Sequence, residues 1–132
     1  MSQENVEAFL EVNEALRRGD IEAVLRWVDE EGVFITARSA VEGAYRGHDG
    51  VRRFMADNAE NFEKFEPDYP DVRDLGDRLL AIGTIHVRGR GSGVETDISA
   101  AGIATFNKEG RMVRWEDFRE RRLALEAVGL RE

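Results

Sequence analysis

Two side chains in the second half of the chain have the chemistry needed to move protons. Asp117 stands between Trp115 and Arg119 in a segment of strand-forming residues, although Asp disfavours strands. Burial in a pocket would raise its pKa, so Asp117 is a candidate acid–base residue. His86 is the second candidate, as a proton shuttle or a hydrogen-bond donor to a substrate. The structural alternatives are an ion pair of Asp117 with Arg119 and a core or rim position for His86.

Two hairpins predict which residues share a face of the sheet. In the first, a loop centred on Gly91 places His86 opposite Thr96. In the second, the following turn places Gly102 opposite Trp115. The predicted shared face has an apolar floor and a polar upper part, as a ligand pocket requires; the polar residues are Thr84, His86, Asp117 and Arg119. In a flat sheet His86 and Asp117 would be roughly 16 Å apart, so a substrate or water is expected between them.

Six residues are predicted to bind substrate around this acid–base pair. Three lie on the predicted sheet face, and three are aromatic residues of other segments that would line the pocket wall or mouth: Trp115, Thr84, Arg119, Tyr45, Phe54 and Trp27. The alternative for these aromatic residues is a structural place in the core. With two His in distant segments, no metal site is expected. Acid–base chemistry also needs no cofactor.

Helical spacing and strand-forming runs predict the elements that position these residues. Gly19 ends a first helix and Asp20 caps a second. The second half forms three consecutive strands joined by tight turns. The predicted order is a helix beginning at Ser2, a helix with the stripe Ile21, Val24, Leu25 and Val28, a strand at 33–37, a turn and short return strand within 38–47, a helix after Asp49, an edge or bulged strand at 65–72 between Pro67 and Pro70, strands at 79–88, 94–106 and 111–119, and a closing helix ended by Gly129.

Helices come first and strands run together, which predicts an α+β fold with helices on one face of a curved antiparallel sheet. The 132 residues form one domain, residues 1–132. Lys and Arg number 19 and Asp and Glu number 27, and the net charge of −8 argues against a nucleic-acid partner. There is no Cys, no apolar run long enough for a membrane span, and no leader-like start, so a cytoplasmic protein without a membrane partner is expected.

The opposite face of the predicted sheet also carries small and apolar residues. They include Ala81, Gly83, Ile85, Val87, Ala101 and Ile103. No predicted helix covers this face, and exposed apolar patches of that size mark interaction surfaces. A homodimer through the outer sheet face is therefore predicted.

Three stretches resemble the SnoaL-like branch of the nuclear-transport-factor-2-like superfamily. They are the helix break at residues 19–24, the strand-to-helix corner Tyr45-Arg46-Gly47-His48-Asp49-Gly50-Val51-Arg52-Arg53-Phe54, and the segment from Gly110 to Phe118 followed by residues 124–130. The resemblance implies a cone-shaped α+β barrel with a pocket between the helices and the concave sheet, often in a homodimer.

Members of that superfamily include polyketide cyclases, ketosteroid isomerases, limonene epoxide hydrolases and non-catalytic domains. Trp115-Glu116-Asp117-Phe118 is similar to the Trp-Arg-Asp-Tyr of the epoxide hydrolases, which places Asp117 on a catalytic Asp. Their Arg-x-Asp partner is missing, because Thr84-Ile85-His86 stands there. The cyclases pair an Asp with a pocket His, so Asp117 with His86 is closer to them.

Two functions are compatible with these observations. The first is a cofactor-independent acid–base isomerase, cyclase or hydratase that acts on an apolar, oxygen-bearing small molecule through Asp117 and His86. The alternative is a non-catalytic ligand-binding or dimerisation domain of the same fold, because fold membership alone does not fix chemistry. In both cases the expected ligand is a small hydrophobic molecule.

Overall fold

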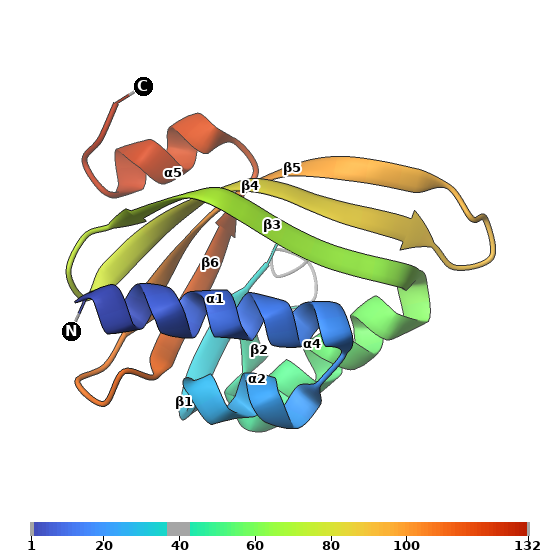
Figure 1. Ribbon diagram of the computed structural model, residues 1–132, viewed down its shortest axis with the longest axis horizontal. Coiled ribbons are helices and arrows are strands. Elements are labelled where there is room, and N and C mark those ends of the chain that lie inside the picture. Colours follow the sequence, from blue (N-terminus) through green and yellow to red (C-terminus); the bar gives the residue numbers. More distant parts are fainter. Residues whose placement is uncertain (1, 37–42, 132) are drawn as a thin grey trace.

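The structure is a computed structural model that describes residues 2–36 and 43–131. Within them lie four helices and six strands (Figure 1). In chain order they are α1 (Ser2–Arg18), α2 (Ile21–Trp27), β1 (Val28–Ile35), β2 (Tyr45–Arg46), α4 (Gly47–Asn61), β3 (Phe62–Asp74), β4 (Arg78–Gly89), β5 (Glu95–Phe106), β6 (Met112–Phe118) and α5 (Arg121–Ala127). The predicted order of elements is confirmed, while Ala37 and the predicted turn at 38–42 lie outside the described residues.

The helix boundaries follow the predicted signals with two differences. Asp20 caps α2 by accepting a 3.1 Å hydrogen bond from the Ala23 backbone N–H. Val28, predicted on the apolar stripe of this helix, instead begins β1, because α2 ends at Trp27. The helix predicted to follow Asp49 begins at Gly47, which puts Asp49 in the first turn of α4, where a negative charge favours the helix dipole.

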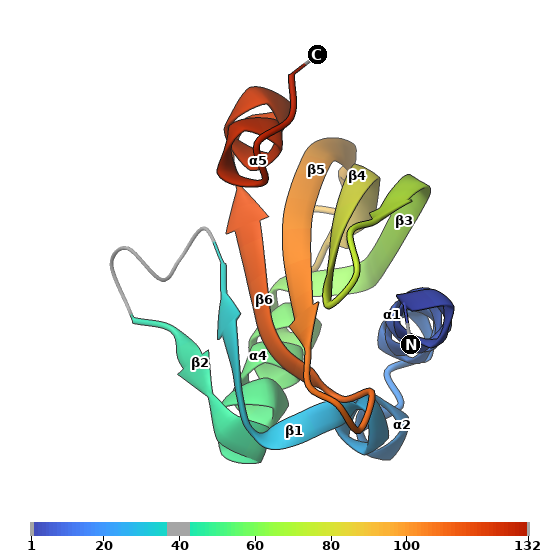
Figure 2. The same ribbon diagram turned by 90° about the vertical axis from the view of Figure 1, so that its left-hand side faces the viewer.

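The six strands form one curved sheet in the order β2-β1-β6-β5-β4-β3. Neighbouring strands are antiparallel except for β1 and β6, which run parallel and are separated along the chain by five other elements. The prediction of a purely antiparallel sheet closed into a barrel is therefore corrected to a mixed, open sheet with β2 and β3 at its edges. The α+β class is confirmed, and Figure 2 shows the curvature, with α1 across the open side.

The register of β5 on β6 differs from the prediction by two residues around Trp115 and Asp117, which keeps these two side chains on their predicted face. Ala104 lies opposite Trp115, and Gly102 lies opposite Asp117. Trp115 and Asp117 therefore face the concave side, toward α1. The main hydrophobic core fills this side and combines residues of α1, α2 and α4 with the inner face of the sheet.

The register of β4 on β5 is shifted by one residue from the prediction, and this reverses the faces of β4. His86 lies opposite Asp97, not Thr96, because the hairpin loop has four residues and not five: the Gly89 N–H donates to the Val94 carbonyl at 3.0 Å. Two glycines of this loop, Gly91 and Gly93, have positive φ. Because the register is shifted by one residue, Thr84 and His86 point outward.

The outer face differs from the one predicted for a homodimer. Ala81, Gly83, Ile85 and Val87 share a face with Gly102 and so lie on the concave side, while Ala101 and Ile103 remain outside. The outer residues Leu80, Ala101 and Ile103 form a second core with Ala124 and Leu125 of α5. The predicted apolar contact surface is thus wrong in composition, and a helix covers part of that face.

Candidate functional site

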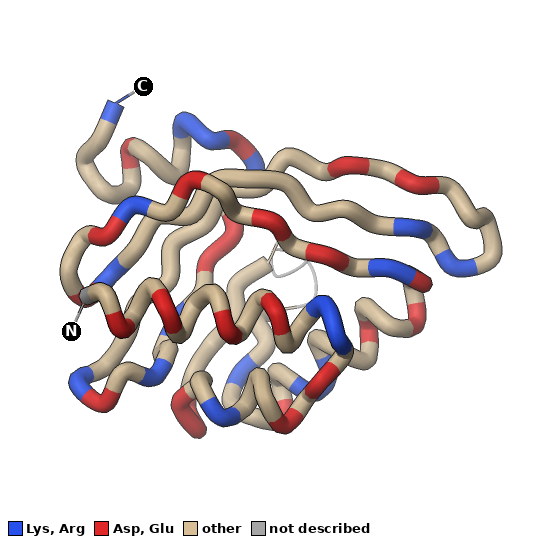
Figure 3. Tube along the Cα trace, in the orientation of Figure 1, with Lys and Arg blue, Asp and Glu red and all other residues tan. Residues whose placement is uncertain are grey.

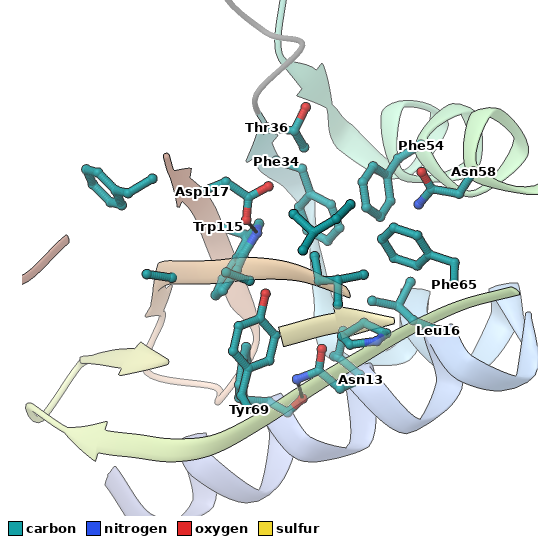
Figure 4. Close-up of a pocket in the computed structure, with 18 of the residues that line it drawn as sticks. Asn13, Leu16, Phe34, Thr36, Phe54, Asn58, Phe65, Tyr69, Trp115 and Asp117 are labelled. Carbon is teal, nitrogen blue, oxygen red and sulfur yellow. Dashed lines mark hydrogen bonds between the residues drawn. The ribbon is translucent and has the colours of Figure 1, made fainter. Parts of the chain in front are cut away.

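A cavity of about 440 Å³ lies between the concave face of the sheet and helices α1 and α4 (Figure 4). Its lining is largely aliphatic and aromatic, as expected for a small-molecule site. The residues that decide its chemistry are Phe9 and Asn13 of α1, Phe54 and Asn58 of α4, Phe65 and Tyr69 of β3, and Trp115 and Asp117 of β6.

Asp117 is held at the wall of this cavity by its neighbour on the same strand face. Trp115 Nε1–H donates a 2.8 Å hydrogen bond to Asp117 Oδ1. The indole reaches this position because Gly102 lies beneath it: a Cβ at Gly102 would be 2.3 Å from the Trp115 ring. The small residues predicted to accommodate Trp115 are thus confirmed, and they orient the carboxyl as well.

The electrostatic environment of Asp117 disfavours its charged form. Burial among apolar groups raises the pKa of Asp117 to about 6, and the Trp115 hydrogen bond opposes this only in part. Among residues 2–36 and 43–131, Asp117 makes no ion pair, so the alternative of a structural pair with Arg119 is not what the structure shows. Arg119 is exposed and lines the cavity.

Tyr69 is the second polar group at this end of the cavity, and sequence reasoning did not identify it. Its ring packs in an aromatic cluster with the rings of Phe9 and Trp115, whose centroids are 5.5 and 5.8 Å away. Its hydroxyl and the Asp117 carboxyl point into the same space (Figure 4). Burial, together with the Asp117 charge, holds the pKa of Tyr69 above its ordinary value of 10.0. The hydroxyl therefore stays protonated and can donate a hydrogen bond.

A bulge in β3 directs Tyr69 into the cavity. Asp68 pairs with Thr84 and Asp71 pairs with Ile82, so two residues of β3 oppose the single residue Gly83 of β4. Gly83 permits this close approach, because a Cβ there would be 2.0 Å from the Asp68 carbonyl oxygen. The prediction of an edge or bulged strand at 65–72 is confirmed.

The remaining predicted site residues divide into two groups. Tyr45 and Phe54 line the cavity and form a second aromatic cluster with Phe34, at centroid distances of 5.4 and 5.5 Å. The Tyr45 hydroxyl is already engaged, since it donates a 2.6 Å hydrogen bond to Asp57. Trp27 packs against the core and does not line the cavity.

His86 and Thr84 do not reach the cavity, because the one-residue shift places both on the outer face. His86 Nδ1 lies 2.7 Å from Asp97 Oδ1, and its Nε2 lies 3.9 Å from Asp68. The predicted placement of His86 and Asp117 on the same face of the sheet is therefore wrong. Asp117 and Tyr69, in contrast, both line the cavity.

Two signals in the sequence could have identified the residues that were missed. Asn58 follows Phe54 and Val51 at helical spacing, so an amide occupies an apolar stripe of α4. Tyr69 stands between Pro67 and Pro70, which marks an irregular strand where one side chain can be redirected. Among the described residues no cluster of His, Asp or Glu could hold a metal ion. None of the described helices is long and apolar enough to cross a membrane.

Solved structures with the same fold are small α+β proteins. TerC, crystallised with polyporic acid, has a TM-score of 0.79 at 22% identity, over 89% of this chain and 92% of TerC. A candidate SnoaL-like polyketide cyclase from Shewanella denitrificans OS-217 has a TM-score of 0.70 at 20% identity, over 86% and 88% of the two chains. A protein with a ketosteroid isomerase-like fold from Catenulispora acidiphila, in complex with trimethylamine, has a TM-score of 0.76 at 14% identity, over 94% and 93%.

At such identities the likeness to these structures is one of fold alone. The sequence itself matches the SnoaL-like domain over residues 6–115. The chain therefore belongs to the SnoaL-like family, as its sequence stretches predicted. No curated protein matches the chain.

Proposed function

We propose that this protein is a cofactor-independent enzyme that transfers a proton on a small, largely apolar, oxygen-bearing molecule, as an isomerase, cyclase or hydratase does. One observation carries the proposal. Asp117 lies in an apolar cavity with one oxygen held by Trp115 and no ion-pair partner in the described part of the chain. A carboxyl that serves only structure is usually neutralised by a neighbour, and unpaired buried acids are enriched at functional sites.

Asp117 suits the role of general base. With a pKa of about 6 it is mostly ionised at neutral pH, yet basic enough to accept a proton. Because Trp115 occupies Oδ1, the other oxygen faces the ligand. Tyr69 suits the role of hydrogen-bond donor to the oxygen that becomes negative.

The proton transfer can be written without any other reactant. Asp117 takes a proton from the carbon next to a ligand carbonyl, and the C–H electron pair forms the enolate, whose oxygen accepts a hydrogen bond from Tyr69. Return of the same proton to another carbon completes an isomerisation. Attack of the enolate carbon on a second carbonyl completes an aldol-type cyclisation, in which Asp117 protonates the new alkoxide. In both reactions Asp117 takes one proton and returns one, so it ends in its starting ionised state.

Deuterium exchange tests this proposal without the physiological substrate. The probe is a naphthalene that carries an acetyl group at each end of its long axis, and NMR in D₂O follows deuterium entering its methyl groups. We expect the wild-type protein to accelerate exchange and Asp117→Asn to reduce that acceleration by roughly 10²–10⁴-fold. Asp97→Asn, a matched change on the outer face, should retain it. Equal exchange with wild type and Asp117→Asn would contradict the proposal.

Binding without turnover is the second candidate function. One feature of the cavity favours binding alone, because catalysis commonly uses several charged groups. Among the described residues, Asp117 and the exposed Arg119 are the only charged side chains in the lining. A probe that binds with no Asp117-dependent exchange would select this function over the first.

A homodimer remains a separate proposal. It can no longer rest on the apolar contact predicted from the sequence, since α5 packs on Leu80, Ala101 and Ile103. A dimer would use the polar outer face of β4 and β5, which includes Thr84 and His86. Light scattering at micromolar concentration tests it, and a monomeric mass would exclude it at that concentration.

A further inference from the structure

Asn58 is a polar residue at the end of the cavity that is otherwise formed by aromatic rings. It lies on the inward stripe of α4, four residues after Phe54, and lines the cavity together with Phe54 and Phe65. Figure 4 shows its amide turned into the space between these two rings. An amide at such a position is unfavourable unless it finds a hydrogen-bond partner.

The amide nitrogen of Asn58 has no such partner in the described residues. Its Nδ2 is buried and donates to no acceptor. Asn13 shows the contrast within the same cavity, since its Nδ2 donates a 3.0 Å hydrogen bond to the Phe9 carbonyl. Buried donors in native structures are nearly always satisfied by protein, water or ligand, and leaving one unsatisfied costs stability.

The two polar ends of the cavity are separated by a largely apolar middle. Asp117 and Tyr69 lie on one side in Figure 4 and Asn58 on the other, with Phe34, Phe54 and the single polar residue Thr36 between them. The Phe34 and Phe54 rings are in contact, with centroids 5.4 Å apart. A ligand that touches both ends must therefore be apolar along its length.

We infer that the substrate carries two oxygen groups at opposite ends of an apolar, ring-containing body, and that Asn58 recognises the end away from the reaction. The inference rests on the proposed function in one respect: the reacting end of the substrate is the carbonyl that binds at Asp117 and Tyr69. The oxygen at Asn58 is an acceptor such as a carbonyl or ether, because Nδ2 is a donor. It is uncharged, because no cationic side chain lines that end of the cavity among the described residues.

A matched pair of probes tests the inference. One is the naphthalene with an acetyl group at each end, and the other replaces one acetyl by isopropyl, which keeps the shape and removes one carbonyl oxygen. Titration calorimetry gives both dissociation constants for wild type, Asn58→Leu and the control Asn61→Leu. Asn61 is exposed on the same helix, and its Nδ2 donates to the Asp57 carbonyl at 2.8 Å.

We expect wild type and Asn61→Leu to bind the two-acetyl probe about 10-fold more tightly than the isopropyl probe. With Asn58→Leu the preference should fall to about twofold, the statistical advantage of a symmetric molecule. Circular dichroism confirms that each variant is folded. A wild-type preference of about twofold, or a preference unchanged by Asn58→Leu, would overturn the inference.

The deuterium exchange assay keeps this result distinct from the proposed function. Exchange that depends on Asp117, without any effect of Asn58 on probe preference, would leave the function standing and remove the inference. An Asn58-dependent preference without exchange would show a binding pocket and contradict catalysis. If neither probe binds, both proposals fail.

Discussion

The two faces of strands β4 to β6 differ in how their carboxylates are partnered. On the outer face, Asp97 pairs with His86 at 2.7 Å, Glu95 with Arg88 at 3.4 Å, and Glu116 with Arg114 at 3.0 Å. On the concave face, Asp117 accepts a hydrogen bond from an indole N–H and pairs with no cation in the described part of the chain. Figure 3 shows positive and negative residues interspersed along the chain.

This difference separates structural charge from functional charge. Exposed ion pairs contribute little to stability, because water and salt screen them. A carboxyl that is desolvated and unpaired has a raised pKa and costs stability when ionised. An ionised Asp117 is therefore expected to lower the free energy of unfolding, whereas the paired carboxylates of the outer face are not.

The largest effect should come from the pH dependence of stability at Asp117. Its pKa is about 6 when folded and ordinary, near 3.8, when unfolded. Between these values the folded protein still holds the proton that the unfolded chain has released, so stability falls as pH rises. At pH 7 the cost is on the order of 3 kcal/mol. Urea unfolding should show the difference between Asp117→Asn and wild type moving in favour of the Asn variant from pH 4 to pH 7.

The corresponding outer-face variant is the control for that experiment. Asp97→Asn should change stability by no more than about 1 kcal/mol at either pH, because Asp97 is exposed and exposed pairs are worth about 0–1 kcal/mol. A difference between Asp117→Asn and wild type that stays constant from pH 4 to pH 7 would mean that the carboxyl is not desolvated.

A smaller effect is expected where the strand makes room for the indole. Gly102→Ala adds a Cβ 2.3 Å from the Trp115 ring, so the ring must move away from Asp117. Overpacking of this kind costs roughly 1–3 kcal/mol. Ser99→Ala, on the exposed half of the same strand, should change stability by less than about 0.5 kcal/mol. Chemical unfolding of both variants checks this, and equal stabilities would show that the indole is not fixed over Gly102.

The smallest effect should be on the outer face. His86→Ala removes the pair with Asp97, and exposed pairs are worth about 0–1 kcal/mol. Deuterium exchange by this variant should match that of wild type, because His86 does not line the cavity. A large loss of exchange with His86→Ala would restore the acid–base pair predicted from the sequence.

The sequence predicted most of the fold because its signals were local. The Gly19–Asp20 pair fixed a helix boundary, and the turn after Asn107 kept Trp115 and Asp117 on the correct face. The loop after Gly89 was different, because several glycines allow either four or five loop residues, and a change of one reverses a whole strand. His86 was misplaced for that reason.

The cavity residues were harder to predict, since they depend on contacts between distant segments. Tyr69 enters the site through a bulge that requires Gly83 on the neighbouring strand. The spacing of Asn58 marks an amide on an apolar stripe, but only the folded structure shows that its buried Nδ2 has no acceptor. Neither condition is visible from the spacing of residues along one element.

The central claim is that Asp117 is a desolvated carboxyl without a counter-ion, and an NMR titration of its side-chain carboxyl carbon measures this directly. The titration midpoint in the wild-type protein should lie at a pKa of about 6. Trp115→Phe should raise that pKa further, because it removes the 2.8 Å hydrogen bond that favours the ionised form. A wild-type midpoint at the ordinary Asp value of 3.8 would contradict the claim, since it would mean that water or a cation stabilises the carboxylate.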